Sequence, residues 1–147
     1  MQNVYFECKI QYEKTKEDGI EKKVSETYLL DAVSFTEAEA RLTEEVTPFI
    51  SGDYTISDIK RAKYSEIITS RKSGDDRWYK AKLMFVTLDE KSGKEKRSAS
   101  LCLVQGKDFR TAFDNLVEAM KGTMSDYETA AISETQIMDV FLFDKSK

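Results

Sequence analysis

Apolar and polar residues alternate along the first strand-like stretch of the chain, YFECKIQY. A period of two is typical of a strand with one buried face. The residues expected on that face are Phe6, Cys8, Ile10 and Tyr12. The same pattern returns about 73 positions later, in a second strand of the same kind. There the apolar places are held by Tyr79, Ala81, Leu83 and Phe85.

The correspondence continues through the rest of the chain and indicates an internal duplication. Turn sequences match first, GIEKK at 19–23 with GKEKR at 93–97. Helix positions follow, with Phe35, Ala38 and Leu42 matched by Phe109, Ala112 and Leu116. Near the end of each copy, EII at 66–68 matches DVF at 139–141. We therefore expect two pseudo-symmetric halves, 1–70 and 76–147, joined by a linker at 71–75.

Each half is predicted to contain a strand, a strand, a helix and a strand. The second strands are KVSETYLL and RSASLCLV, and the third strands are 54–68 and 127–143, with a bulge as one way to fit their length. Ser34 and Asp108 precede the helices as capping residues. Helices with one apolar stripe cover a sheet face. The predicted fold is α+β: a single domain with a six-stranded, mainly antiparallel sheet and two helices on one face.

Composition and charge narrow the classes of function. The chain has 147 residues, a net charge of −4 and no histidine. Histidine-based triads and histidine metal sites are thereby excluded, and no glycine-rich phosphate loop is present. Cys8 and Cys102 fall at apolar strand positions and are expected to be buried free thiols of a cytoplasmic protein. We predict no enzymatic activity, no cofactor, no metal and no membrane association.

The outer face of the duplicated first strands carries the first candidate ligand-binding residues. An aromatic ring beside lysines can stack on a base while the ammonium groups meet phosphate. The alternative is that Trp78 packs in a subunit interface. The residues concerned are Tyr5, Lys9, Trp78, Lys80 and Lys82.

Glu66 and Asp139 occupy equivalent places in the two halves and are the second candidate set. One interpretation makes them carboxylates that flank a central ligand pocket. The favoured alternative is a structural ion pair with Lys9 and Lys82, or a place on an edge strand near the surface. Asp139 lies within IMDVFLF, a run that is apolar on both faces. A second subunit is the expected cover for one of those faces, so a homodimer or higher homo-oligomer is predicted.

The stretches YFECKIQYEK, SFTEAEARL, DDRWYKAK and LDEKSGKEK, together with MKGTMSDYETAAISETQIMDVF, resemble a family of short uncharacterised proteins. Members of that family occur in gut Bacteroidetes and in their phages. The resemblance implies a bacterial or phage context and brings no functional residues with it.

Three functions remain open at this point. The first is a non-catalytic, oligomeric pocket protein that binds a nucleotide-like or anionic small molecule, as in phage sequestration of a host nucleotide immune signal. The second is an accessory protein that binds single-stranded nucleic acid, which the acidic net charge disfavours. The third is a protein–protein assembly module built on the apolar third strand.

Overall fold

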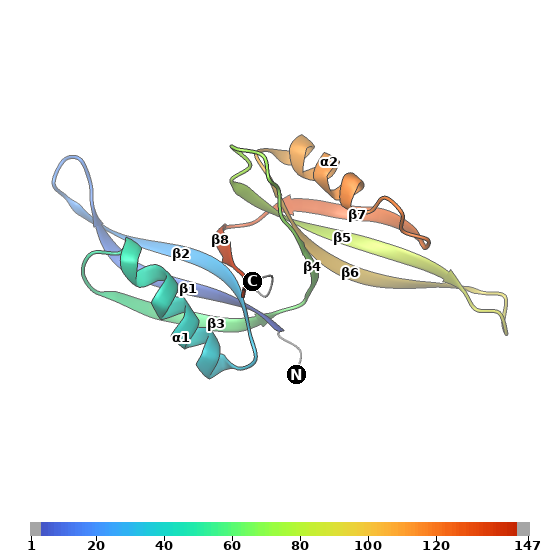
Figure 1. The fold of residues 1–147 in the computed structure, drawn as a ribbon, viewed down its shortest axis with the longest axis horizontal. Helices are drawn as coiled ribbons and strands as arrows, with labels where there is room; N and C mark the ends of the chain where they lie inside the picture. The colour runs from blue at the N-terminus through green and yellow to red at the C-terminus, as the bar shows by residue number, and fades with distance from the viewer. Residues whose placement is uncertain (1–3, 144–147) are drawn as a thin grey trace. The chain divides into compact units, whose positions relative to one another are not determined.

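The computed structural model describes residues 4–143, which form two compact units (Figure 1). Unit 1 contains residues up to Ala62 and from Gln136 onward, and unit 2 spans Lys63–Thr135. The outermost residues of the predicted halves, 1–3 and 144–147, lie outside the described part of the chain. Each unit consists of one four-stranded sheet with one helix packed against it.

Unit 1 is built from a long hairpin, a helix and two further strands. Strands β1 (Val4–Thr15) and β2 (Glu21–Ala32) form the hairpin and precede helix α1 (Phe35–Val46) and the 3-10 turn Thr47–Phe49. Strand β3 (Tyr54–Ala62) pairs antiparallel with β1, and β8 (Ile137–Phe141) pairs parallel with β2. The strand order is β3-β1-β2-β8.

Unit 2 repeats this arrangement. Its elements are β4 (Tyr64–Ile68), β5 (Arg77–Leu88), β6 (Glu95–Gly106), α2 (Phe109–Ala119) and β7 (Asp126–Glu134). The order β4-β6-β5-β7 again places a short parallel strand beside the second strand of the hairpin. The prediction of an α+β fold is thus confirmed.

The predicted single six-stranded sheet is wrong, because the described residues form eight strands in two sheets of four. The long third strand of each half is in fact two strands. Only Lys63 separates β3 from β4, yet β3 joins the sheet of unit 1 and β4 that of unit 2. In the same way, β8 leaves β7 and completes the sheet of unit 1. We call this feature the strand exchange.

Irregularities in the sheets repeat at equivalent positions of the two units. The β1–β3 register shifts between Lys9 and Ile10, and the β5–β7 register shifts between Lys82 and Leu83. Each parallel pair also contains one shift, at Tyr64/Glu66 in β4 and at the matching place in β8. Bulges are specific features of a fold. Their recurrence therefore supports the duplication inferred from the apolar pattern.

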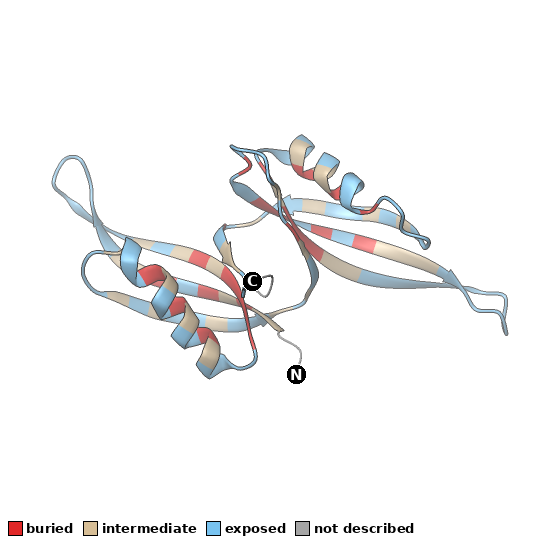
Figure 2. Ribbon diagram, viewed as in Figure 1, coloured by how far each residue is buried: buried red, intermediate tan, exposed pale blue. Residues whose placement is uncertain are grey.

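Each unit buries its own apolar core between sheet and helix (Figure 2). Phe6, Cys8 and Ile10 are fully buried beneath α1, as the alternation predicts. The equivalent core beneath α2 includes Tyr79, Ala81 and Leu83. Both predicted capping side chains accept a hydrogen bond: Ser34 Oγ from the Glu37 N–H and Asp108 Oδ1 from the Thr111 N–H.

Helix α2 approaches its sheet closely at Gly106, the last residue of β6. A Cβ atom at this position would lie 2.7 Å from the backbone nitrogen of Ala112. Only a glycine leaves room for such an approach. The end of β6 therefore fixes where the first turn of α2 rests.

Candidate functional site: an aromatic groove in unit 1

A carboxylate on the helix side of the unit 1 sheet organises the candidate site. Glu26 lies in β2 between Val24 and Tyr28, on the same face as the buried Leu30. Its Oε1 accepts a 2.8 Å hydrogen bond from the Tyr28 hydroxyl, and its Oε2 accepts a 3.0 Å bond from the Tyr12 hydroxyl. The two tyrosines are thus fixed around a single acidic group.

The environment holds both tyrosines in their neutral form. Burial, followed by the hydrogen bond to Glu26 and the charge of Glu26, raises the pKa of Tyr28 well above its ordinary value. The same causes raise the pKa of Tyr12. A hydrogen bond donated to a carboxylate favours the protonated phenol. Both hydroxyls therefore remain donors at neutral pH.

The tyrosines form one wall of a cavity of about 300 Å³, here called the aromatic groove. The Phe141 ring stacks on Tyr28 at a centroid distance of 5.3 Å and an angle of 19°. Phe49, the last residue of the 3-10 turn, and Ile50, which follows it, also line the cavity. The full lining is Tyr12, Glu26, Tyr28, Phe49, Ile50, Met138, Asp139 and Phe141.

The rim of the aromatic groove is apolar and open to solvent. Phe49 is 79% exposed and Met138 is 55% exposed. Asp139 is also exposed, and its Oδ1 accepts a 2.8 Å hydrogen bond from the N–H of Val140. Concave sites with mainly aromatic walls and a few convergent polar groups are the usual form of a small-molecule site.

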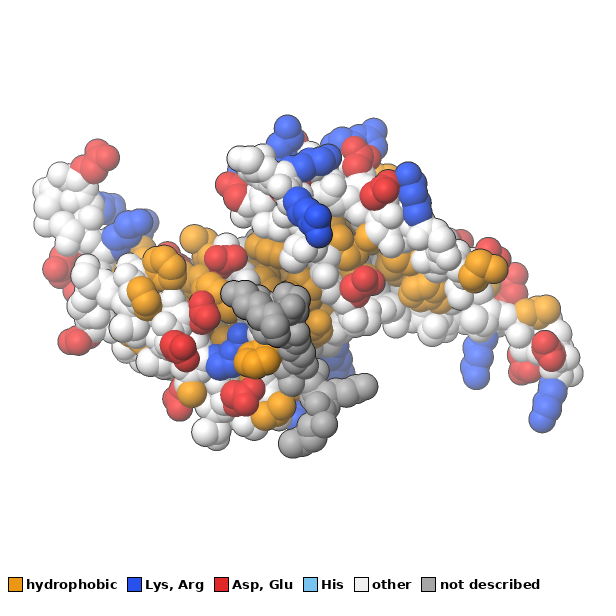
Figure 3. Space-filling view, in the orientation of Figure 1, with side chains coloured by type: hydrophobic (Ala, Val, Ile, Leu, Met, Phe, Trp, Pro, Cys, Tyr) orange, Lys and Arg blue, Asp and Glu red, His pale blue; other side chains and the backbone are white. Residues whose placement is uncertain are grey.

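The aromatic groove is acidic. Its lining contains two carboxylates, Glu26 and Asp139, and neither lysine nor arginine. The surrounding unit has the same bias: unit 1 contains 15 Asp and Glu against 10 Lys and Arg, a net charge of −5. Unit 2 contains 12 Asp and Glu against 13 Lys and Arg, a net charge of +1. Figure 3 shows acidic side chains distributed over the visible surface of unit 1.

Unit 2 has a different chemistry at the matching positions. The places of Glu26 and Tyr28 are taken by Ser100 and Cys102, and the Ser100 hydroxyl lies 2.6 Å from that of Ser65. The remaining counterparts are Phe85 for Tyr12, Glu66 for Asp139 and Ile68 for Phe141. The tyrosine–carboxylate network is therefore a property of unit 1 alone among these equivalent positions.

The candidate ligand-binding residues from the sequence are divided between the two units. Asp139 lines the aromatic groove, and Glu66 pairs with Cys102 on the equivalent helix side of the other sheet. Lys9 lies on the sheet face turned away from α1, beside a cavity of about 190 Å³ whose charged lining also includes Glu7, Asp58 and Lys60. Tyr5, on the same strand, is half-buried.

The remaining candidates lie on β5 of unit 2. Trp78 is only 3% exposed, which leaves little ring surface for stacking, whereas Lys80 and Lys82 are exposed. No ion pair within residues 4–143 joins Glu66 or Asp139 to Lys9 or Lys82. The carboxylates and these lysines project from opposite sheet faces, since strand neighbours alternate in direction. Binding by these residues, the homo-oligomer and the nucleic-acid partner stay predictions.

Sequence reasoning missed the centre of the aromatic groove, namely Tyr12, Glu26 and Tyr28. The alternation along the first strand predicts Tyr12 in the core, and it assigns no role to Glu26 or Tyr28. A signal was nevertheless present, because Glu26 shares its strand face with Val24, Tyr28 and Leu30. A glutamate on a face that is otherwise apolar needs hydrogen-bonding partners. Tyrosines on the same face could supply them.

Neither cysteine offers a reactive thiolate. Burial raises the pKa of the Cys8 thiol to about 12 and raises that of Cys102 as well. A thiolate is the reactive form of cysteine. The described residues also contain no group of three or more Cys, Asp or Glu side chains arranged to hold a metal ion.

Comparison with known proteins places the chain in a family. Residues 4–143 match the family described as a domain of unknown function (DUF4494), and the chain belongs to it. Searches of curated proteins and of solved structures gave no significant match. Within residues 4–143, neither helix has the length and apolar character that a membrane span requires.

Proposed function

We propose that this protein is a non-catalytic binding protein and that the aromatic groove of unit 1 holds its ligand. The observation that carries the proposal is the convergence of Tyr12, Tyr28 and Phe141 with two carboxylates around one cavity. Its volume of about 300 Å³ suits a small molecule. The hydrogen-bonded tyrosines give the site a wall that is already formed before a ligand arrives.

The chemistry of the groove favours binding over catalysis. The chain contains no histidine, and both hydroxyls next to Glu26 have raised pKa values that keep them from acting as phenolate nucleophiles. Cysteine nucleophiles are buried and protonated. The groups that remain can orient and hold a ligand through stacking and hydrogen bonds.

A nucleotide-like ligand would use its base in this site. A planar base can stack against aromatic side chains, and its amino group can donate to a carboxylate such as Asp139. Sequestration of a nucleotide signal, expected from the sequence for a bacterial or phage setting, would also require basic side chains that contact the phosphates. The lining of the groove has no basic side chain and carries two carboxylates, so the groove favours a ligand without phosphates.

Isothermal titration calorimetry with a panel of nucleosides, nucleotides, cyclic dinucleotides and aromatic amines tests the proposed function. We expect at least one class to bind with 1:1 stoichiometry, and Tyr28→Ala to weaken binding about tenfold or more through the loss of stacking. Glu118→Gln is the matched surface control, since Glu118 is exposed on α2 in unit 2. Absence of heat with every class, or equal loss in the control, would refute the proposal.

A further inference from the structure

We infer that the aromatic groove selects an organic cation: an ammonium group carried on an apolar body. This inference rests on the proposed function and specifies the ligand class. Two observations point to it together. The lining contains Glu26 and Asp139 without a basic residue, and its rim exposes the apolar side chains of Phe49 and Met138.

Glu26 keeps its negative charge available to a ligand. Each of its oxygens accepts one hydrogen bond from a tyrosine, at 2.8 and 3.0 Å. A carboxylate has about four lone-pair positions, so two bonds leave acceptor capacity unused. Both donors are neutral phenols, and none of the ion pairs among residues 4–143 involves Glu26. The charge is thus oriented by its partners without being neutralised.

Asp139 supplies a second negative charge at the same cavity. Its Oδ1 accepts from the Val140 N–H, and its other oxygen is not engaged by that bond. Two carboxylates with no nearby basic side chain in the lining create a negative potential, which attracts a cation and repels an anion. A cationic ligand would reduce the repulsion between them.

The aromatic walls suit the same ligand. The faces of tyrosine and phenylalanine rings attract ammonium groups, and this attraction strengthens when water is displaced. Tyr12, Tyr28, Phe49 and Phe141 provide such rings around the cavity. The exposed apolar side chains of the rim, Phe49 and Met138, can then contact the carbon body of the ligand.

Three probes with the same phenyl group separate charge from shape. Phenethylamine is cationic, 2-phenylethanol is neutral and 3-phenylpropionate is anionic at neutral pH. By calorimetry or NMR titration we expect the amine to bind about tenfold tighter than the alcohol, and the carboxylate to bind not at all. Higher salt should lower the affinity for the amine and leave the affinity for the alcohol unchanged.

Asp139→Asn is the central variant, because Asp139 is exposed and asparagine retains the oxygen that accepts from Val140. We expect a loss of amine affinity of about threefold to tenfold with no change for the alcohol. Glu118→Gln removes the same charge from unit 2 and should leave amine affinity unchanged. Circular dichroism of each variant verifies that the fold is retained.

The outcomes distinguish the inference from the function on which it rests. Equal affinity for amine and alcohol would overturn cation selection while leaving a binding site in place. So would equal weakening by Asp139→Asn and Glu118→Gln. Failure of all three probes and of the nucleotide panel would overturn both. Tight binding of 3-phenylpropionate would contradict the assigned charge preference directly.

Discussion

At the residue scale, Glu26 is the side chain on which the aromatic groove depends. It accepts from Tyr12 and Tyr28, which lie on two neighbouring strands, and thereby links β1 to β2 through side chains as well as backbone. Tyr28 in turn carries the stacked Phe141 of β8. One carboxylate consequently sets the position of rings from three strands.

Replacing Glu26 by glutamine should lower the pKa of Tyr28. The substitution removes the negative charge that disfavours the phenolate, while burial, the largest cause of the shift, remains. The pKa should therefore fall but stay above the ordinary value. NMR titration of ring-labelled tyrosine checks this, with Tyr28→Phe identifying the resonance. An unchanged titration in the glutamine variant would contradict the role given to Glu26.

The same shift has a consequence for stability in alkaline solution. The folded-state pKa of Tyr28 lies above its unfolded value, so the native state favours the protonated form. This contribution is fully present below the ordinary tyrosine pKa, and it is lost as the pH rises toward the folded-state value. In Glu26→Gln, the free energy of unfolding should fall less as the pH rises. Urea unfolding at increasing pH measures this difference.

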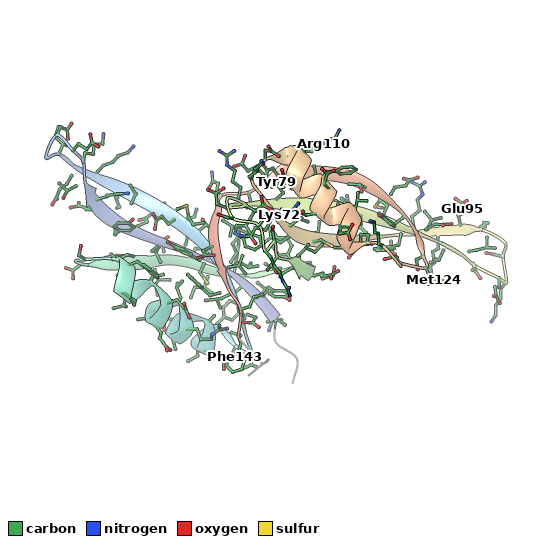
Figure 4. All side chains as sticks on the ribbon, turned by 45° about the horizontal axis from the view of Figure 1, so that its top comes forward. Lys72, Tyr79, Glu95, Arg110, Met124 and Phe143 are labelled. Atoms are coloured by element: carbon green, nitrogen blue, oxygen red, sulfur yellow. The ribbon has the colours of Figure 1, made fainter. Side chains whose placement is uncertain are left out.

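At the element scale, a side-chain lock holds the residues that follow β8. Asp31 accepts from the N–H of Phe143 at 2.7 Å and forms a 2.7 Å ion pair with Arg41. Arg41 also donates to the carbonyl oxygens of Asp31 and Phe141 and lies over the Phe143 ring at 5.7 Å. Figure 4 shows Phe143 beside helix α1.

Unit 2 holds the segment after β4 at the equivalent positions, with a glutamine and an asparagine in place of the ion pair. The Ser70 N–H donates to Gln105 Oε1 at 2.8 Å, and Asn115 donates to the Gln105 carbonyl at 2.8 Å. Gln105 and Asn115 are the counterparts of Asp31 and Arg41. Asp75, from the linker, adds contacts to Ser70 and Asn115. Equivalent backbone positions are thus fixed by two different chemistries.

Asp31→Ala should destabilise the protein more than Gln105→Ala. The first change leaves the largely buried Arg41 without its carboxylate partner, which costs roughly 2–3 kcal/mol for a pair that retains some solvent contact. The second removes one hydrogen bond, from the Ser70 N–H to Gln105 Oε1, worth about 1 kcal/mol, and keeps the bond from Asn115 to the Gln105 backbone carbonyl. Urea unfolding measures the loss of unfolding free energy in both variants. Hydrogen exchange should show reduced protection of the β8 amides only in Asp31→Ala. Equal losses of unfolding free energy in the two variants would refute the larger contribution assigned to the Asp31–Arg41 ion pair.

Elements were predictable from the sequence where the pattern is local. Alternation along β1 and β5 and the capping residues Ser34 and Asp108 depend on neighbouring positions, and the structure confirms them. The division of the third strand was not predictable in this way. Lys63 is the only residue between β3 and β4, and neither glycine nor proline marks the break. Which sheet accepts β4 depends on tertiary pairing that a strand pattern does not encode.

In the candidate site, too, the local pattern was predictable from the sequence and the tertiary pairing was not. Tyr12, Glu26 and Tyr28 share a sheet face, which alternation reveals. Asp139 and Phe141 reach them only because β8 pairs with β2 across more than 100 residues of sequence. The prediction that Asp139 and Glu66 flank one pocket assumed a common sheet, and the separate sheets place them in different units.

At the scale of the whole molecule, the strand exchange makes each sheet depend on both halves of the chain. Residues 1–73 contribute β4 to unit 2, and residues 74–147 contribute β8 to unit 1. Cleavage in the exposed linker beside Gly74 would therefore leave the fragments joined by two parallel strand pairs. Covalent continuity at the linker is not what holds the halves together.

A protease site inserted between Ser73 and Gly74 tests this dependence. After cleavage, we expect the two fragments to elute together as a 1:1 complex in size-exclusion chromatography and to separate only in denaturant. As a comparison, a variant that ends after Gln136 lacks β8 and should release its fragments more readily. Separation of the full-length fragments under native conditions would contradict the exchanged pairing.

The strand exchange also dictates the order in which the protein can be completed during synthesis. Three strands and the helix of unit 1 are synthesised before unit 2, but its fourth strand follows all of residues 63–135. At a translation rate of ~5–20 residues per second, that interval lasts roughly 4–15 seconds. During this time the edge of β2 that later receives β8 is unpaired, and the polypeptide carries an incomplete N-terminal sheet. Nascent chains should therefore need protection at this edge until β8 emerges.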